Sequence, residues 1–283
     1  MRSARSASIS MLSGVLLVLG LGLAPSAMAS DGPSSEAGWT LGEDDGTLTA
    51  PDRPEAVEAP GEVGAMIVSG TRATSSRGMA AVLINEHLHC SGSIVHNRWV
   101  LTAKHCIMYD SNGNGVPDTK YPASSLSVRV KSLNADSGGG VVGVSLTKVR
   151  ASNDIAMLKL DRSANAEPVR LASANPKLFS ETYAFGWGAP CKGCGYSSYL
   201  KRATQRVSGA SSDLWGGEAI RVNGINGYVC HADSGGPLFK LVDGARYQVG
   251  VLSSGDRSCG SGSNHYSSVP RSQAWIEDVI ARF

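Results

Sequence analysis

The sequence predicts an all-β body that ends in one C-terminal helix. Many short runs alternate apolar and polar residues, and clusters of Gly, Asn, Ser and Pro separate them; examples are AAVLI, WVLTA, SLSVRV, IAMLKL and YQVGVLSS. Short alternating runs between turn residues are typical of antiparallel sheets. The final segment, RSQAWIEDVIARF, has a helical period instead, which places four apolar residues on one face: Trp275, Ile276, Val279 and Ile280.

The first 29 residues differ from this body and have the features of a secretory signal peptide. A basic start, MRSARS, precedes the apolar run MLSGVLLVLGLGL, and Ala27 and Ala29 frame a small-residue cleavage site. The run is shorter than the roughly 18 apolar residues of a membrane-spanning helix. We therefore expect a protein that is secreted to the extracellular space and has no membrane partner.

Residues 30–66 form an acidic leader with almost no β pattern. They contain four prolines and nine Asp or Glu against one Arg, whereas residues 67–283 contain 23 Lys or Arg against 15 Asp or Glu. The net charges of −8 and +8 suggest a largely disordered propeptide that rests on the basic body, and a solvated spacer is the alternative. Because Lys and Arg do not cluster among aromatic residues, we expect no nucleic-acid partner.

One segment of the body, CHADSGGPLF, places Ser234 between an aspartate and two glycines. A serine hydroxyl is a weak nucleophile at neutral pH, so it needs a base, an orienting acid and oxyanion donors. The chain offers His105 in WVLTAKHC, after an apolar run, and Asp154 in SNDIAMLKL, just before another alternating run. Serine, histidine and aspartate are the three groups of a hydrolytic triad.

Four segments together resemble the chymotrypsin/trypsin-type serine endopeptidases: LTAKHC, NDIAMLKL, the GWG of residues 186–188, and CHADSGGPLF. The order of His, Asp and Ser along the chain also agrees with that family, in a secreted, bacterial-like form with signal peptide and propeptide. The resemblance implies two six-stranded Greek-key β-barrels, over residues 67–165 and 166–283, and the second region also contains the C-terminal helix. The active site would lie in the cleft between them.

The resemblance also assigns roles to residues. Ser234 would attack the carbonyl carbon of a protein or peptide substrate, His105 would move the proton, and Asp154 would orient the imidazole. The backbone N–H groups of Ala232 and Ser234 would bind the oxyanion. We expect a monomer that requires no cofactor. A protease-like binding protein with weak or no turnover is the alternative.

The segment GAMIVSG suggests that the chain is a precursor. Ile67 resembles the new amino terminus that family members gain when a propeptide is removed, so the cut would follow Met66. The resemblance implies that the freed ammonium pairs with Asp233 and orders the oxyanion loop. An ordinary first strand is the alternative interpretation of this segment.

Six cysteines in an exported chain suggest three disulfides, for which arithmetic alone allows fifteen pairings. The resemblance selects three pairs: Cys90 with Cys106, Cys230 with Cys259, and Cys191 with Cys194. The last pair, in PCKGCG, also has the spacing of redox and zinc motifs, but the chain lacks a βαβ setting and a second pair of zinc ligands. We expect a structural disulfide there and no metal.

The sequence departs from the family pattern near the site. Ala232 stands where most members have glycine, in a backbone conformation that glycine adopts more easily. Lys104 replaces a small residue, and strand alternation points it away from the imidazole. Between Ser253, which would orient the aspartate, and Gly255, which would pair with substrate backbone, Ser254 replaces a tryptophan. We therefore expect shallow subsites beyond the first.

The resemblance places Tyr228 at the floor of the primary pocket, where trypsin-like enzymes carry aspartate, with Val229 beside it. Because this pocket has no negative charge, we expect Met, Leu or a small apolar side chain before the cut bond, and not Arg or Lys. His265 and Tyr266 lie on the facing segment NHYSS and are candidates to add polarity.

The segment DSNGNGVPD, residues 110–118, resembles calcium loops of the D-x-N-x-N-G type. Tyr121 stands where the twelfth-position carboxylate of such a loop belongs. Two full charges are few for tight binding, so the segment is either a weak Ca²⁺ site or an exposed Asn-Gly turn.

Overall fold

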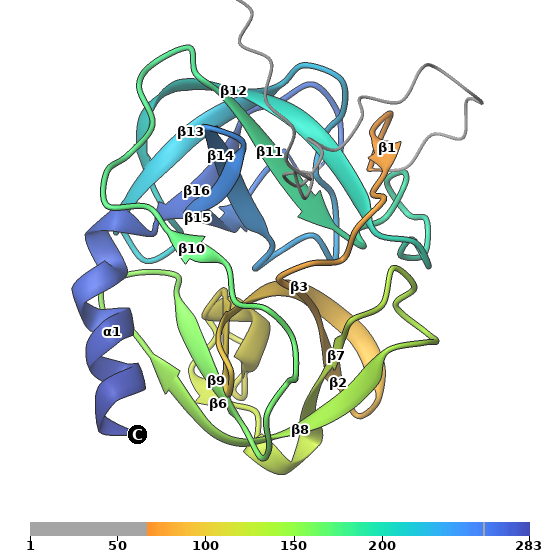
Figure 1. Ribbon diagram of the computed structural model, residues 1–283, viewed down its shortest axis with the longest axis vertical. Coiled ribbons are helices and arrows are strands. Elements are labelled where there is room, and N and C mark those ends of the chain that lie inside the picture. The colour runs from red at the N-terminus through yellow and green to blue at the C-terminus, as the bar shows by residue number, and fades with distance from the viewer. Residues whose placement is uncertain (1–66, 257) are drawn as a thin grey trace, which may run out of the picture. The chain divides into compact units, whose positions relative to one another are not determined.

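The computed structural model describes residues 67–256 and 258–283, so the expected signal peptide and acidic leader lie outside the described residues. Six antiparallel strands close into a first barrel in the order β2–β3–β4–β9–β8–β7 (Figure 1). Their bounds are Met79–Ile84 for β2, His87–His96 for β3, Trp99–Thr102 for β4, Leu126–Val130 for β7, Gly140–Val149 for β8 and Ala156–Leu160 for β9.

A second ring of six antiparallel strands follows the order β12–β11–β14–β15–β16–β13, and β13 pairs back with β12. Two such barrels and a C-terminal helix confirm the predicted fold class. The strand bounds are Glu181–Gly186 for β11, Lys201–Ser212 for β12, Glu218–Gly224 for β13, Pro237–Val242 for β14, Ala245–Ser254 for β15 and Asn264–Ser268 for β16.

Two short strands attach to the outside of the second ring. β1 (Thr71–Arg72) pairs with β12, although it precedes the first barrel in the sequence, and β10 (Arg170–Leu171) runs parallel to β15. The start of the described chain therefore lies against the second barrel. The remaining short elements are the β5–β6 hairpin (Met108–Tyr109 and Thr119–Lys120) and the 3₁₀ turns η1 (His105–Ile107), η2 (Ala123–Ser125) and η3 (Pro270–Ser272).

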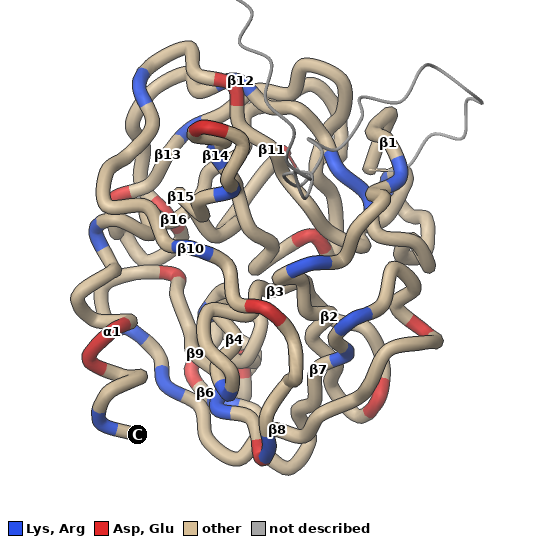
Figure 2. Tube along the Cα trace, in the orientation of Figure 1, with Lys and Arg blue, Asp and Glu red and all other residues tan. Residues whose placement is uncertain are grey.

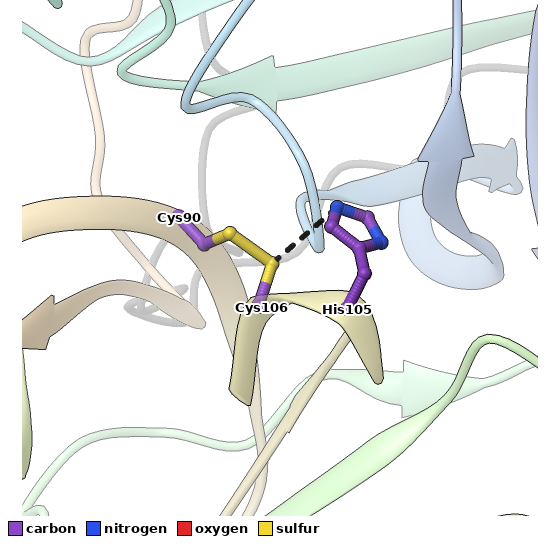
Figure 3. Close-up of side chains that lie close together, drawn as sticks. All are labelled: Cys90, His105 and Cys106. Atoms are coloured by element: carbon purple, nitrogen blue, oxygen red, sulfur yellow. Dashed lines mark hydrogen bonds between the residues drawn. A yellow bond between two sulfur atoms is a disulfide. The ribbon is translucent and has the colours of Figure 1, made fainter. Parts of the chain in front are cut away.

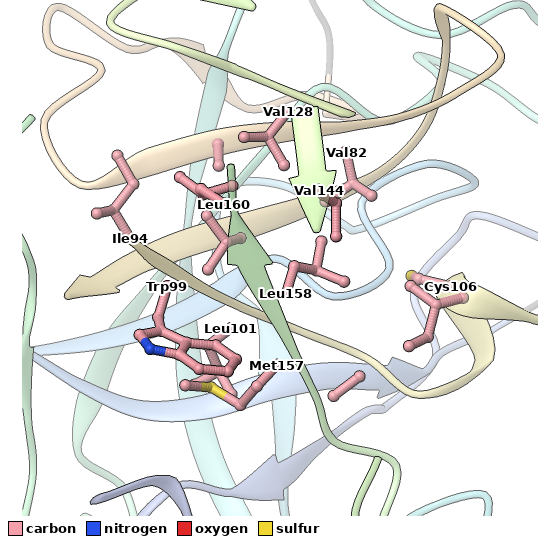
Figure 4. Packing of buried hydrophobic residues seen from close by; sticks show 14 of the residues in the cluster. Val82, Ile94, Trp99, Leu101, Cys106, Val128, Val144, Met157, Leu158 and Leu160 are labelled. Atoms are coloured by element: carbon pink, nitrogen blue, oxygen red, sulfur yellow. The ribbon is translucent and has the colours of Figure 1, made fainter. Parts of the chain in front are cut away.

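Strand alternation produces the core of the first barrel. In β7, the sequence LSVRV buries its three apolar residues and leaves the two polar ones partly exposed. These side chains meet others from every strand of the barrel, including Trp99, Leu101 and Met157 (Figure 4). A packed interior of this kind makes the strand ends, where the candidate residues lie, a rigid platform.

The C-terminal helix α1 (Gln273–Arg282) comes from the end of the second barrel but packs against the first. Ile276 and Val279 are buried in the same cluster as the first-barrel core, and Trp275 and Ile280 are partly buried against it. The apolar face predicted from the sequence is thus the face that packs. The helix joins the two halves of the described chain (Figure 1).

Charged residues of both signs are interspersed along the described chain (Figure 2). Within residues 67–256 and 258–283, no helix combines the length and the apolar character needed to cross a bilayer.

Candidate active site

His105 and Asp154 lie at the ends of two paired strands. Thr102 at the end of β4 pairs with Ala156 at the start of β9, so the residues just beyond them are neighbours. The His105 backbone N–H donates to Asp154 Oδ1 at 2.9 Å, and His105 Nδ1 lies 2.7 Å from Oδ2. Because an ionised carboxylate only accepts, this contact places a proton on Nδ1 and leaves Nε2 as the acceptor.

Asp154 is fully buried and is also held from the second barrel. Ser253, near the end of β15, donates its hydroxyl to Asp154 Oδ2 at 2.6 Å. The backbone N–H of Asp154 donates to Asp213 Oδ2 at 2.9 Å. Since both carboxylate oxygens and the backbone have partners, the carboxylate is fixed, and it fixes the imidazole in turn.

The second imidazole nitrogen lies beside a disulfide. His105 Nε2 is 3.8 Å from the Sγ of Cys106, which is bonded to Cys90 (Figure 3). Sulfur atoms joined in a disulfide are not thiolate ligands, so this group of side chains does not have the chemistry of a metal site. The disulfide joins β3 to η1 and restricts movement of His105.

Ser234 lies in the loop between β13 and β14 and shares a cleft of about 380 Å³ with His105. The cleft wall also includes His89, Tyr196 and His231. Burial lowers the pKa of His89, and the neighbouring His105 lowers it further. In residues 67–256 and 258–283 no hydrogen bond joins the imidazole to the Ser234 hydroxyl. Such contacts are often long before substrate binds.

The loop before Ser234 has a strained backbone and two free donors. Ala232 has a φ of 70°, in the left-handed region that favours glycine. Ser91 holds the loop, since its N–H donates to Ser234 O at 2.8 Å and its hydroxyl donates to Ala232 O at 3.0 Å. Among the described residues, the N–H groups of Ala232 and Ser234 have no acceptor. Two free donors beside a hydroxyl are what an oxyanion site needs.

Asp233 is a buried carboxylate between these two residues. It accepts the backbone N–H groups of Gly188 at 2.7 Å and Cys230 at 2.9 Å. Burial raises the pKa of Asp233 to about 7, and the two N–H groups oppose this shift. The Ile67 side chain is also buried, but within the described chain no bond joins Ile67 to Asp233. The predicted pair requires the ammonium that cleavage after Met66 would free, so it stays a prediction for the cut chain.

Comparison with known proteins assigns the chain to a family. The family model named Trypsin matches residues 67–276. This chain belongs to the trypsin family. Serine protease SP24D of Anopheles gambiae is 30% identical over an alignment of 246 residues that covers 78% of this chain and 83% of that protein. Trypsin CFT-1 of Choristoneura fumiferana is 31% identical over 66% of this chain and 78% of its own length.

Solved structures agree with the trypsin fold. Neuropsin, a serine protease expressed in the limbic system of mouse brain, superposes with a TM-score of 0.59 at 24% identity, covering 75% of this chain and 98% of its own. Human heparin binding protein gives a TM-score of 0.63 at 20% identity, covering 76% and 97%. At these identities the likeness concerns the fold alone. The two curated relatives are insect proteins and do not support the bacterial-like description.

All six cysteines of this trypsin-family chain are in disulfides. The structure forms the pairs that the resemblance implies, Cys90–Cys106, Cys191–Cys194 and Cys230–Cys259. The third pair ties the loop before Ser234 to the segment after β15. The first and third pairs therefore restrain the two sides of the candidate site.

The structure adds one residue to the predicted primary pocket. A Cβ atom on Gly255 would lie 2.5 Å from Asn264 Oδ1 and 3.4 Å from a Val229 methyl group, so these two side chains flank Gly255. Asn264 is buried, and sequence analysis missed it. Its position two residues before Tyr266, on the segment that faces the pocket, is the signal that would have found it.

Tyr228 lies between β13 and the start of the described chain. Its N–H donates to Val68 O at 2.9 Å, and its ring edge lies against Gly224. On the facing strand, His265 Nδ1 and the Tyr266 hydroxyl are buried without a hydrogen-bond partner among the described residues. Burial lowers the pKa of His265, with a smaller contribution from Arg221.

Residues 110–118 form a compact loop between β5 and β6. Asp110 accepts backbone N–H groups from Asn112, Gly113, Asn114 and Gly115. Asp118 accepts the Asn112 side-chain amide at 2.6 Å. Backbone N–H groups, chiefly that of Gly115, lower the pKa of Asp110, and hydrogen bonds from Ser111 and Thr119 lower the pKa of Asp118. The bonds stabilise the loop as an Asx-type turn.

Proposed function

We propose that residues 67–283 act as a secreted serine endopeptidase that uses Ser234, His105 and Asp154 to hydrolyse peptide bonds in proteins. One observation carries this proposal: a buried carboxylate accepts one hydrogen bond from the His105 backbone N–H and one from its imidazole Nδ1, beside a cleft that contains the serine. Membership of the trypsin family supports the same reaction. The N–H groups of Ala232 and Ser234, which have no acceptor among the described residues, supply the oxyanion donors that this reaction also needs.

In the proposed reaction, Ser234 Oγ bonds to the substrate carbonyl carbon while its proton moves to His105 Nε2. The negative charge that develops on the carbonyl oxygen is received by the N–H groups of Ala232 and Ser234. The proton then passes to the leaving amine, the C–N bond breaks, and an acyl ester remains on Ser234. Water attacks this ester by the same route, while Asp154 stabilises the imidazolium in both halves.

The proposal includes activation by cleavage after Met66. Among the described residues of the uncut chain, Asp233 is buried with two N–H partners and no cation, which is an unfavourable environment for a charge. A free ammonium at Ile67 would supply the missing countercharge. Release of the acidic leader, itself a proposed partner of the body, would therefore reorganise the loop that carries Ala232 and Ser234.

The proposed primary pocket is neutral. Val229 and Asn264 flank Gly255, and Tyr228 provides no negative charge for an Arg or Lys side chain. We expect peptides with Met or Leu before the cut bond to have kcat/KM values at least tenfold above those of peptides with Arg, because a buried cation without a partner is costly. Efficient cleavage after Arg would refute the neutral pocket.

A fluorophosphonate probe tests the reaction directly. The mature chain, prepared with a free Ile67 amine, should be labelled at Ser234, and the Ser234→Ala variant should not be labelled. Ser145→Ala, at an exposed serine of β8, is the matched control and should label normally. A folded mature chain that neither labels nor hydrolyses peptides would instead be a protease-like binding protein. Export is tested by sequencing the amino terminus of protein recovered from the culture medium.

A further inference from the structure

Lys104, the residue directly before His105, is a buried cation beside the candidate triad. Only 7% of Lys104 is exposed. Its ammonium donates to the Ala151 carbonyl oxygen at 3.3 Å and lies 4.5 Å from the centre of the Trp215 ring. The carbonyl oxygen and the aromatic face take the place of water around the buried ammonium. These contacts agree with the predicted direction of the side chain, away from the imidazole.

Asp213, in the turn between β12 and β13, is a second buried carboxylate next to the candidate triad. Its Oδ2 accepts the backbone N–H of Asp154 at 2.9 Å and the Ser267 hydroxyl at 2.8 Å. Its Oδ1 accepts the backbone N–H groups of Trp215 and Gly217, each at 2.9 Å. All four partners donate, which is the pattern of a carboxylate, since an ionised carboxyl group only accepts.

The ammonium and the second carboxylate belong to one buried group of charges. Trp215 contacts both, because its ring lies over the Lys104 ammonium and its backbone N–H donates to Asp213. Burial lowers the pKa of Lys104, and the charges of Asp154 and Asp213 oppose this shift. Lys104, Asp154 and Asp213 together carry one net negative charge, as does a triad with a single carboxylate. Lys104 therefore compensates the charge that Asp213 adds.

The cleft around the imidazole contains other titratable side chains: His89, Tyr196 and His231. Burial lowers the pKa of His89, which favours its neutral form. A hydrogen bond to Asp136 raises the pKa of Tyr196, which keeps the phenol neutral. His231 is exposed, so solvent screens any charge on its ring. In the next loop, the Asp233 carboxylate is occupied by two backbone N–H groups. The buried ammonium is thus the cation best placed to act on the imidazole.

We propose that Lys104 is an electrostatic positioning residue, whose charge offsets Asp213 and keeps the His105 imidazole neutral to lower pH. The inference rests on the proposed function, in which a neutral imidazole takes the serine proton. A nearby cation disfavours the imidazolium, and an added carboxylate favours it. The ammonium acts without touching the ring, because charges in a buried site are weakly screened. Turnover then extends to a pH at which an imidazole beside two uncompensated carboxylates is protonated.

Titration of the His105 ring by NMR tests the inference without requiring turnover. The full uncut chain is labelled in its histidine rings, and His105→Asn assigns the signal. Lys104→Met should raise the midpoint of this titration by about half a pH unit or more, and Asp213→Asn should lower it by a similar amount. The double variant should lie near the unchanged chain, and Lys104→Arg should retain the original midpoint. Lys159→Met, which removes a cation 5.9 Å from the Trp99 ring, is the matched control and should cause no shift.

The outcomes separate this inference from the proposed function. In the mature chain, the acidic limb of the pH profile of kcat/KM should move by the same amounts as the NMR midpoints. If Lys104→Met shifts neither, or if Lys104→Arg shifts them as Lys104→Met does, the charge role is refuted and the endopeptidase stands. Absence of fluorophosphonate labelling refutes the endopeptidase and with it any role of Lys104 in turnover. Thermal unfolding checks each fold, and if Lys104→Met does not fold, an unshifted midpoint in Asp213→Asn refutes the inference.

Discussion

The two sides of the candidate site are built differently. On the first-barrel side, His105 and Asp154 have their backbone and side-chain groups paired, and a disulfide holds the turn that carries the imidazole. On the second-barrel side, the loop from Ala232 to Ser234 contains a left-handed alanine, and within the described part of the chain it has two N–H groups without an acceptor and a buried carboxylate without a cation. In the uncut chain the imidazole of His105 already has its Asp154 partner. We therefore expect activation to change the loop that carries Ser234.

Replacing the Asp154 carboxylate, on the first-barrel side, should have the largest effect on turnover. Asp154→Asn keeps the size of the side chain, but its amide cannot hold the Nδ1 proton and stabilise the imidazolium. We expect kcat of the mature chain to fall about 10⁴-fold, as in other Ser-His-Asp triads. Steady-state hydrolysis measures this effect, with Asp161→Asn at an exposed aspartate as the control. If kcat of Asp154→Asn falls less than tenfold, the hydrogen-bonded Asp154 on the first-barrel side does not contribute to turnover.

The pH dependence of stability tests whether Asp233, on the second-barrel side, is a buried carboxyl group without a countercharge. Its folded pKa of about 7 exceeds the unfolded value of 3.8, so between these values the folded chain binds more protons than the unfolded chain. The free energy of unfolding must then fall as pH rises from about 4 to 7, by about 4 kcal/mol in total. Denaturant unfolding of the uncut chain at several pH values should show this decline, relative to Asp233→Asn, which lacks the titrating group.

The same measurement on the mature chain tests the proposed pair of Ile67 and Asp233. If the Ile67 ammonium pairs with Asp233, the pKa of the carboxyl group falls and the decline in stability between pH 4 and 7 should disappear. Equal pH dependence in the uncut and mature chains would contradict the proposed pair. Acetylation of the Ile67 amine should restore the decline and abolish turnover.

The sequence predicts the first-barrel side, with His105 and Asp154, better than the loop of residues 232–234. His105 and Asp154 each lie beside an alternating strand, and antiparallel pairing of β4 with β9 brings them together. The helix face and the fold class follow from the same periodicities and from the resemblance. These features depend on local patterns, which a single sequence shows.

Contacts between distant segments were not predictable in the same way. Ser91 is 141 positions from the Ala232 carbonyl that it holds, and Asp213 is 59 positions from Asp154. Neither residue stands in a recognisable motif, because a hydroxyl or carboxylate that binds backbone can come from any segment that the fold brings near.

A smaller effect is expected from relieving strain in the loop. Ala232→Gly removes the Cβ atom from a residue with a φ of 70°, so the folded chain should gain up to about 1 kcal/mol in the free energy of unfolding. Denaturant unfolding of the uncut chain measures the gain. Ala219→Gly, at a buried position in β13, is the control and should instead lose stability. A loss at Ala232 as well would show that the loop is not strained.

The smallest expected effect is that of Ca²⁺ on turnover, through residues 110–118 of the first-barrel side. Residues 110–118 follow the η1 turn, and Asp110 and Asp118 already accept hydrogen bonds from their own loop. With Tyr121 in place of a third carboxylate, we propose that any Ca²⁺ site has a Kd weaker than about 1 mM and that turnover does not require the ion. Calorimetry of the mature chain with and without chelator tests this, with Asp118→Asn as the control. Micromolar binding that Asp118→Asn abolishes would contradict the proposed weak affinity and show that residues 110–118 form a Ca²⁺ site.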